Sequence, residues 1–288
     1  MKVTGFSFIK NAVKFQYPIV EALQSILPVC DEVIVVAGDS NDDTRELVSA
    51  IHTNKIRVID SVWDNSLKNG RVLAIETDKA LNEISPETDW CFYIQGDEVV
   101  HENGYEEIVC AMRKWKDVKE VDGLLFKYRH FYGSYDYTGV SSRWYKNEIR
   151  IIRNDKSIFS YRDAQGFRKR QNEKLNVKPL NAYIHHYGWV REPKTMLGKQ
   201  QNFLNYYRDN SKEIKKTFQG EFNYNEIDAL EKFTGTHPAI MQPYINNHNW
   251  QFNFDPSYNK TSLKERFKNG VEKITGKRPF DFNNYKII

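Results

Sequence analysis

Long apolar runs are missing from this chain of 288 residues. Its mean hydropathy is -0.68, and no stretch approaches the roughly 18 apolar residues that a membrane-spanning helix needs. The first residues are too few and too polar for a secretory signal, so we expect a strand at the start of the chain. These features argue against a membrane-embedded or exported class of protein.

Cysteine is also scarce. Cys30, Cys91 and Cys110 are an odd number and lack the spacing of a metal site. The first two stand beside apolar, strand-like segments, where a small buried thiol is the ordinary interpretation. We therefore expect a reducing, cytoplasmic location.

Long runs of one charge are absent as well. The net charge is +4, and no five like charges follow one another, so charge gives no indication of nucleic-acid binding. Basic residues do gather in the middle of the chain, around Arg150, Arg162 and Arg168. This zone suits an anionic phosphate substrate, although a solvated face with scattered charge explains the same counts.

Neither of two common phosphate-binding signatures occurs. No Gly-x-Gly-x-x-Gly follows the first expected strand, and no Walker loop is present. The usual dinucleotide-binding and P-loop classes are therefore not indicated.

What the chain does contain is an alternation of strand-like and helix-like segments over its first 115 residues. Val33 to Ala37 is a continuous apolar run of the kind found in a parallel strand buried on both faces. The alternation predicts an α/β fold with a doubly wound, mostly parallel sheet. Expected strands are 3–9, 33–37, 56–59 and 90–94, followed by 124–128, 148–152 and 182–186 in longer connections.

From Pro193 onward the pattern becomes helical. We expect a catalytic domain over residues 1–192 and a mainly helical extension over 193–288 that packs on it. Met196, Lys199, Phe203 and Tyr206 are spaced for one helix face. A second stripe is formed by Leu263, Phe267, Val271 and Ile274. It is accompanied by Lys264, Arg266, Lys268 and Lys273, so contact with a membrane surface is the alternative to packing on the core.

Residues 93–102 combine the end of an apolar strand with two carboxylates. Asp97 and Glu98 follow Gly96 directly after the strand. Ligands of α/β proteins gather at the carboxyl ends of strands, and carboxylate oxygens suit a hard divalent cation. The segment therefore predicts a cation site that serves phosphate chemistry.

Several segments, taken in order, resemble family 2 glycosyltransferases, which adopt the GT-A fold. They are Phe8-Ile9-Lys10-Asn11, the stretch from Val33 to Thr44, Asn69-Gly70 and Gln95-Gly96-Asp97-Glu98. The resemblance covers residues 1 to 115, weakens toward residue 190, and is not found beyond. It implies a Rossmann-like GT-A fold and transfer of a sugar from a UDP- or GDP-sugar to a saccharide or related acceptor.

The resemblance also implies a nucleotide pocket formed by Ile9, Asn11, Asp39, Asn69 and Gln95. Asp39 would accept a hydrogen bond from the base, with a simple turn residue as the alternative. Gln95 departs from the family, which more often has aspartate here. An amide can bond a ribose hydroxyl but brings no charge to a metal.

Metal binding is implied in the same way. Asp97 matches the last aspartate of the family's Asp-x-Asp motif, which holds Mn²⁺ or Mg²⁺ against the donor's two phosphates. Glu98 is either a second ligand or the partner of an arginine, and an acidic helix start is the plain alternative. The resemblance also implies a downstream histidine as a ligand, because several GT-A enzymes recruit one. His185 and His186 are adjacent in a strand and face opposite ways, so only one of them would bind, and His186 is nearer to the loop. Arg191 is a candidate for the diphosphate and Trp189 for a sugar face.

An inverting transferase needs a carboxylate base for the acceptor hydroxyl. Asp163 is the candidate, and Glu148 and Asp136 are its rivals. The aromatic segment 128–137 is a candidate acceptor platform, while a loop packed on its own aromatics explains the composition equally well.

Two other functions are compatible with a fold of this kind. A sugar-nucleotide nucleotidyltransferase would need a glycine-rich and basic loop after the first strand, which residues 8–14 lack. A non-catalytic nucleotide-sugar-binding homologue is suggested only by Gln95. By analogy with bacterial enzymes of this kind, we expect a role in polysaccharide biosynthesis.

Overall fold

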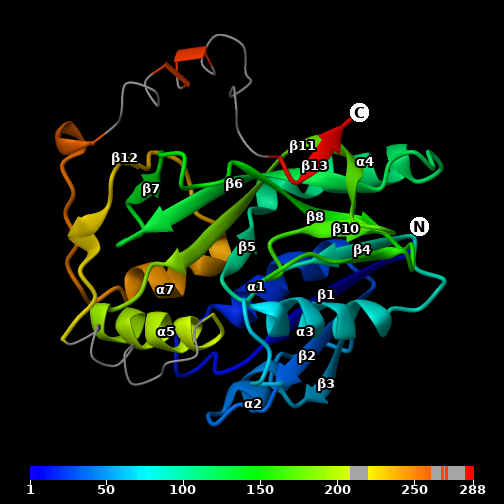
Figure 1. The fold of residues 1–288 in the computed structure, drawn as a ribbon, viewed down its shortest axis with the longest axis horizontal. Coiled ribbons are helices and arrows are strands. Elements are labelled where there is room, and N and C mark those ends of the chain that lie inside the picture. The colour runs from blue at the N-terminus through cyan, green and yellow to red at the C-terminus, as the bar shows by residue number, and fades with distance from the viewer. Residues whose placement is uncertain (208–219, 261–266, 269, 272–282) are drawn as a thin grey trace.

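The computed structural model describes residues 1–207, 220–260, 267–268, 270–271 and 283–288. Its strands form one mixed sheet that runs through the molecule (Figure 1). The principal strands, in their order across the sheet, are β3 (Ile56–Ser61), β2 (Glu32–Gly38), β1 (Val3–Ile9), β4 (Trp90–Tyr93), β8 (Asn147–Arg153), β6 (Gly123–Tyr132), β11 (Glu173–Trp189), β10 (Phe167–Lys169) and β9 (Ile158–Ser160).

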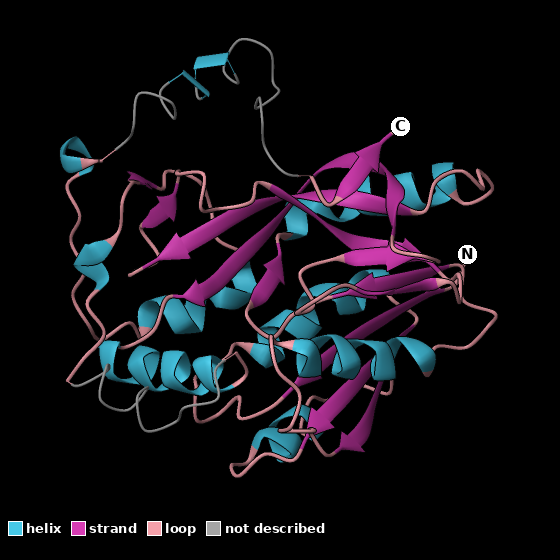
Figure 2. Ribbon diagram, in the orientation of Figure 1, coloured by secondary structure: helices cyan, strands magenta, loops and turns pink. Residues whose placement is uncertain are grey.

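Strands β3, β2, β1 and β4 are all parallel to their neighbours, and β6 is parallel to β11. Strand β8 runs against both of its neighbours, and so does β10 near the far edge of the sheet. Helices lie around the sheet (Figure 2): α1 (Ile19–Ile26), α2 (Thr44–Ser49), α3 (Arg71–Asn82) and α4 (Tyr105–Trp115). The predicted α/β fold with a mostly parallel sheet is thereby confirmed.

Strand β2 shows how the sequence builds this core. Its side chains alternate between the two faces of the sheet. Val33 and Val35 join one buried cluster with Leu23, while Ile34 and Val36 join another with Phe6 on the opposite face. A strand covered on both sides has no place for polar residues, which explains its unbroken apolar sequence.

Two strands differ from the expected pattern and matter for the site. Strand β5 (Glu98–Val100) was not expected, and it pairs antiparallel with β11 so that Glu98 lies opposite His186. Strand β11 runs from Glu173 to Trp189, well beyond the expected 182–186. Its residues alternate polar and apolar irregularly, and pairing with β6, β5, β10 and β13 (Tyr285–Ile287) holds it extended.

The remaining elements are short, apart from α5 (Pro193–Asn205). They are η1 (Leu27–Val29), η2 (Glu102–Gly104), β7 (Tyr137–Gly139), η3 (Tyr224–Glu226), β12 (Leu230–Lys232), η4 (Ala239–Met241), α7 (Gln242–Asn246) and η5 (Pro256–Tyr258). No helix within the described ranges is long and apolar enough to cross a membrane. The division at residue 192 stays a prediction. Of the expected C-terminal stripe, Leu263, Ile274, Lys264, Arg266 and Lys273 lie outside the described residues.

Candidate functional site

A cavity of about 340 Å³ lies where β1 and β4 end and their loops begin. Its walls also include residues of the loop around Asp163, the end of β11 and helix α5, together with Trp63, Leu73, Tyr145 and Arg150. Aromatic side chains dominate one part of it, where Trp63 contacts both Phe8 and Tyr206, with ring centres 5.8 and 5.6 Å apart. The cavity stands at the carboxyl ends of parallel strands, as expected of a ligand site in this class of fold.

The structure brings six of the predicted site residues to this cavity. They are Ile9, Gln95, Asp97, Asp163, His186 and Trp189. Their spread over the sequence, from residue 9 to residue 189, shows that the sheet gathers them from separate loops.

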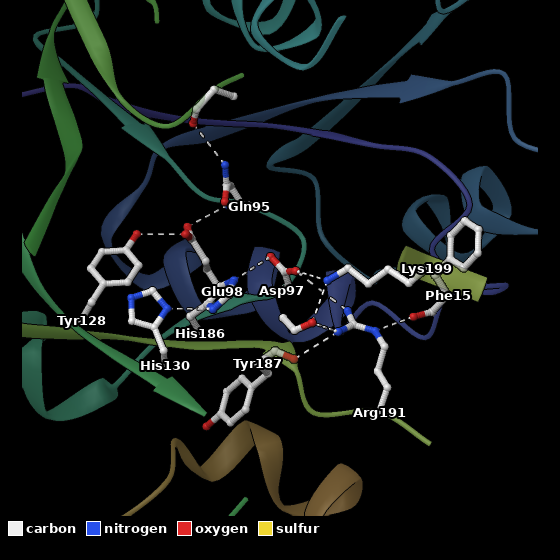
Figure 3. A network of polar contacts seen from close by, with 12 residues as sticks. Phe15, Gln95, Asp97, Glu98, Tyr128, His130, His186, Tyr187, Arg191 and Lys199 are labelled. Atoms are coloured by element: carbon white, nitrogen blue, oxygen red, sulfur yellow. Dashed lines mark hydrogen bonds and ion pairs between the residues drawn. The ribbon is translucent and has the colours of Figure 1, made fainter. Parts of the chain in front are cut away.

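Asp97 is the centre of the charged part of the cavity (Figure 3). Lys199 donates a hydrogen bond of 3.1 Å to its Oδ2 and another of 2.7 Å to the carbonyl of Gly188. Arg191 and His186 approach the same carboxylate at 3.9 and 3.7 Å. Burial alone would raise the pKa of Asp97, but these three neighbours outweigh it and hold that pKa well below the usual range. The carboxylate is therefore ionised at neutral pH.

Arg191 is fully buried behind Asp97 and does not line the cavity. It donates to the backbone carbonyls of Phe15 and Gly188, each over 2.6 Å, and to Tyr187. Its second terminal nitrogen has no hydrogen-bond partner among the described residues. Arg191 thus adds a fixed positive charge beneath the carboxylate.

Hydrogen bonds fix the tautomers of the neighbouring histidines His130 and His186. Burial lowers the pKa of His130 to about 3 and that of His186 to about 4, so both are neutral at pH 7. His130 Nε2 lies 2.8 Å from the carbonyl of Tyr145 and must be its donor. His130 Nδ1 is then an acceptor, and His186 Nδ1 donates to it over 3.0 Å. His186 Nε2 consequently keeps its lone pair, and this nitrogen faces Asp97 Oδ1.

The donor atoms around Asp97 decide whether the predicted Mn²⁺ or Mg²⁺ fits this place. Among the described residues, no three His, Cys, Asp or Glu side chains gather as a metal centre. Asp97 and His186 nevertheless aim two electron-pair donors at one place, and the second nitrogen of His186 is held by a hydrogen bond, as metal-binding histidines usually are. Because Mg²⁺ commonly takes its other ligands from bound phosphates, the pair fits a cation that binds together with a phosphate-bearing ligand.

Glu98 does not share this place. Arg150 donates to both of its carboxylate oxygens, over 2.8 and 2.6 Å, and Tyr128 donates to one of them over 2.9 Å. Glu98 is fully buried and does not line the cavity. Glu98 was predicted to be either a second metal ligand or the partner of an arginine, and the structure shows it paired with Arg150.

Gln95 joins two walls of the cavity. Its side-chain amide donates to the hydroxyl of Tyr93 over 3.2 Å and to the carbonyl of Ala164 over 3.3 Å. The loop that carries Asp163 is thus tied to the end of β4.

Asp163 lies in that loop with its carboxylate held by Tyr207 and Gln165, at 2.6 and 2.7 Å. Its neighbours Arg162 and Ala164 have positive φ angles of 56° and 63°. Such conformations cost energy in residues other than glycine and often mark functional loops.

Neither rival base lines the cavity. Glu148 is buried, which raises its pKa to about 7 against the opposing effect of Arg150. Its Oε1 accepts a hydrogen bond from the backbone of Ile149. Asp136 lies in the loop after β6 and accepts a hydrogen bond from the hydroxyl of Ser134.

Three residues predicted for the nucleotide lie beside the cavity instead of in its lining. Asp39 accepts a 2.8 Å bond from Lys10, which does line the cavity, and faces a separate cavity of about 390 Å³. Partial burial would raise its pKa, but the bonds from Lys10 and Trp63 outweigh this and lower it. The backbone N–H of Asn11 donates to the hydroxyl of Ser40, and the Asn11 side-chain oxygen accepts from the backbone N–H of Asn41. Asn69, with φ of 58°, leads into helix α3.

Lys199 is the main residue that the sequence interpretation missed. It belongs to the predicted helix stripe of Met196, Phe203 and Tyr206. A lysine inside an otherwise apolar face indicates a buried cation with a partner, and that signal was present in the sequence.

Comparisons with known proteins give distant structural likenesses only. No family model matches the chain, and no curated protein matches it. The structure of S. aureus TarS covers 76% of this chain at 16% identity, with a TM-score of 0.43. TarS 1–349 in complex with UDP covers 76% at 14% identity, with a TM-score of 0.40. Glucosyl-3-phosphoglycerate synthase from Mycobacterium tuberculosis, in complex with Mn²⁺, UDP and phosphoglyceric acid, covers 45% at 19% identity, with a TM-score of 0.30.

The matched region is 43% of the length of that TarS chain, 70% of TarS 1–349 and 43% of the synthase. Likenesses at these scores carry no conclusion about function, which has to rest on the site itself.

Proposed function

We propose that this chain is an inverting glycosyltransferase that moves a sugar from a UDP- or GDP-sugar to a saccharide acceptor. The observation that carries the proposal is the two-part cavity. Aromatic rings of Phe8, Trp63 and Tyr206 line one part, and Asp97, His186 and Lys199 line the other. A nucleotide diphosphate has the same two parts, a flat base and a doubly charged group.

The charged part suits the leaving diphosphate. Mn²⁺ or Mg²⁺ held by Asp97 and His186 would act as a Lewis acid on the departing phosphate oxygens. Lys199 adds a cation supplied by the chain itself, and its ammonium group already lies in the cavity wall. Charge that grows on the diphosphate during transfer would be stabilised by these groups, which are already in place.

Asp163 is the proposed general base. It would accept the proton of the acceptor hydroxyl as that oxygen attacks the anomeric carbon from the side opposite the diphosphate, which inverts the configuration. The hydrogen bonds from Tyr207 and Gln165 fix the carboxylate for this task.

Calorimetric titration with UDP, GDP and CDP, in Mn²⁺ and in EDTA, tests the proposal. We expect one nucleotide to bind, and Asp97→Asn to weaken that binding. Donor hydrolysis should be lost in Asp163→Asn while nucleotide affinity is kept. Binding of none of the three nucleotides under either condition would refute a nucleotide-sugar site. Release of pyrophosphate from a nucleoside triphosphate and a sugar phosphate would instead identify a nucleotidyltransferase.

We place this activity in polysaccharide biosynthesis in the cytoplasm, by analogy alone. Detection of the protein in a fractionated cell extract of its source would check the location.

A further inference from the structure

A second cavity, of about 750 Å³, lies next to the proposed donor cavity. Its walls come from β6, from the segment 138–147, from Glu231 of β12, and from Tyr183 of β11 and Asn259. We propose that it binds the acceptor and that the acceptor is an anionic saccharide, one whose sugar rings carry carboxylate or phosphate groups. Its role as acceptor site rests on the proposed function, whereas its preference for anionic saccharides rests on its own residues.

The cavity exists because the sheet opens at this point. Strand β8 pairs with β6 only as far as Asn147, which lies opposite Lys127. Beyond Lys127, β6 continues to Tyr132 and next meets β7 at the pair Phe131 and Thr138. The cavity lies along this part of β6. Lys127 and Arg129 line it from one face of the strand, and Tyr128 and His130 line it from the other.

Lys127 and Arg129 give this space its positive charge. Lys127 Nζ bonds the neutral amide of Asn181 over 2.7 Å, and Arg129 contacts the ring of His185 at 3.3 Å. Both lie over the ring of Tyr183, with the Arg129 guanidinium 3.9 Å from its centre. Across the described part of the chain, neither cation forms an ion pair with a carboxylate.

The lining contains one acidic residue, Glu231, against Lys127, Arg129 and Lys146. Glu231 accepts a bond from Thr138 and lies at the β12 side of the cavity. An anionic ligand could therefore pair with Lys127 and Arg129 without displacing an existing ion pair. Such charge-assisted hydrogen bonds are stronger than neutral ones, and arginine suits the planar carboxylate and phosphate groups in particular.

Aromatic side chains make the same space suitable for sugar rings. Trp144, Tyr145 and Tyr183 line it together with the cations. Flat, partly exposed aromatic rings with hydrogen-bonding groups between them can contact the apolar faces of pyranose rings while leaving the hydroxyls free to bond. A simple inorganic anion would not need these rings, which favours a saccharide as the ligand.

The second cavity is joined to the first through shared residues. Tyr145 lines both cavities. His130 lines the second one and accepts the hydrogen bond from His186, which lines the first. Trp144 of the second cavity meets Trp189 of the first edge to face, with ring centres 6.1 Å apart. A saccharide that fills the second cavity would therefore present one end toward the donor.

Titration of the full chain with matched oligosaccharides tests this proposal. Tetragalacturonate carries a carboxylate on every ring, and maltotetraose is a neutral chain of the same length. We expect saturation-transfer NMR and calorimetry to detect tetragalacturonate and to find maltotetraose bound at least tenfold more weakly. The pair glucose 6-phosphate and glucose, measured in the same way, shows whether phosphate can replace carboxylate.

Single substitutions test whether tetragalacturonate binds in the second cavity. Lys127→Ala and Arg129→Ala should each weaken tetragalacturonate binding roughly tenfold to hundredfold, the effect of losing one charge-assisted hydrogen bond. Lys178→Ala, which removes a lysine that lies on Trp115 outside both cavities, should leave it unchanged. Nucleotide affinity should stay the same in all three variants.

The outcomes separate this proposal from the proposed function. Equal binding of charged and neutral saccharides, or unchanged binding in Lys127→Ala and Arg129→Ala, would overturn the anionic acceptor site even if a nucleotide binds. Charge-dependent saccharide binding in a chain that binds no nucleotide would support the anionic site and refute the transferase.

Discussion

A buried ammonium group is costly unless it has a partner. Lys199 pairs with Asp97 and with the carbonyl of Gly188, which accounts for two of its three N–H groups among the described contacts. Burial, assisted by Arg191, lowers its pKa to about 8 although Asp97 opposes the change. The amine thus remains mostly protonated at pH 7 and retains a donor for an incoming phosphate.

We predict that Lys199→Met weakens nucleotide diphosphate binding by about 2 kcal/mol, roughly 30-fold, because one charge-assisted hydrogen bond is lost. Methionine keeps much of the length and apolar volume of the side chain. Calorimetry with the nucleotide that binds best gives the measurement.

Lys194→Met is the matched control, since Lys194 is exposed on the same helix. It should bind the diphosphate as the unchanged protein does. The corresponding nucleoside, which has no phosphate, should bind equally well to both variants. If Lys199→Met weakened nucleoside binding as much as diphosphate binding, the cause would be a damaged cavity and not a lost phosphate contact.

How far the sequence predicts individual site residues depends on where their partners lie. Asp97 follows from the rule that ligands gather at strand ends, whereas Gln95 and Ile9 were implied by the family resemblance alone. The structure places all three in the lining of the cavity. The role of Glu98 was left open because its partner, Arg150, lies 52 residues away. No local pattern can choose between a metal ligand and a distant ion pair.

At the scale of elements, the same ion pair connects strand β5 to strand β8. Arg150 and Glu98 are 1% and 0% exposed at their side chains. Removing one partner of a buried pair leaves the other charged and uncompensated, which typically costs 3–5 kcal/mol.

We therefore predict that Glu98→Gln lowers the free energy of unfolding by about 3 kcal/mol, measured by urea denaturation at pH 7. Glu87→Gln, which removes the exposed partner of Lys2, should change it by less than about 0.5 kcal/mol. A similar small change in Glu98→Gln would mean that Arg150 finds another acceptor.

A carboxyl group between α3 and β9 gives a pH-dependent prediction. Asp78 accepts a hydrogen bond from the backbone of Ser160, yet burial raises its pKa to about 6. The folded state therefore binds a proton more tightly than the unfolded chain, and this group's contribution to stability falls as the pH rises from about 4 to about 6.

Asp78→Asn removes this titration while keeping an acceptor for Ser160. We expect the variant to be more stable than the unchanged protein at pH 7, by no more than about 1 kcal/mol because the group is partly solvated. The difference should vanish near pH 4. Thermal unfolding at both pH values checks this, and a variant less stable at pH 7 would contradict it.

Element prediction succeeded where one short segment carries its own pattern, as in the apolar run of β2. It failed for β5, whose three residues become a strand only by pairing with β11. It also underestimated β11 at its start, where Leu175 and Val177 are held by β13 from the other end of the chain. Both failures concern pairings across long sequence separations, which periodicity does not encode.

At the scale of the whole molecule, the C-terminal strand β13 joins the central sheet. Strand β13 pairs with β11, and Tyr285 is buried with Phe167, Leu175 and Val177. The backbone carbonyl of Asn284 also accepts a hydrogen bond from the buried Arg168. Figure 1 shows β13 on the opposite side of the molecule from α5. Asn284 lies beside Gly166, next to the Asp163 loop, but Tyr285 itself does not line the proposed donor cavity.

This separation predicts that stability and nucleotide binding can be changed independently. Tyr285→Ala should lower the free energy of unfolding by about 3 kcal/mol, because it removes a buried aromatic ring and leaves a cavity. Tyr258→Ala is the control, since Tyr258 is 77% exposed and should have little effect. Well below the unfolding transition, both variants should bind the nucleotide with the affinity of the unchanged protein, because neither side chain touches the cavity. Suppose instead that Tyr285→Ala lowered the free energy of nucleotide binding as much as the free energy of unfolding. The geometry of the donor cavity would then have to depend on the far edge of the sheet.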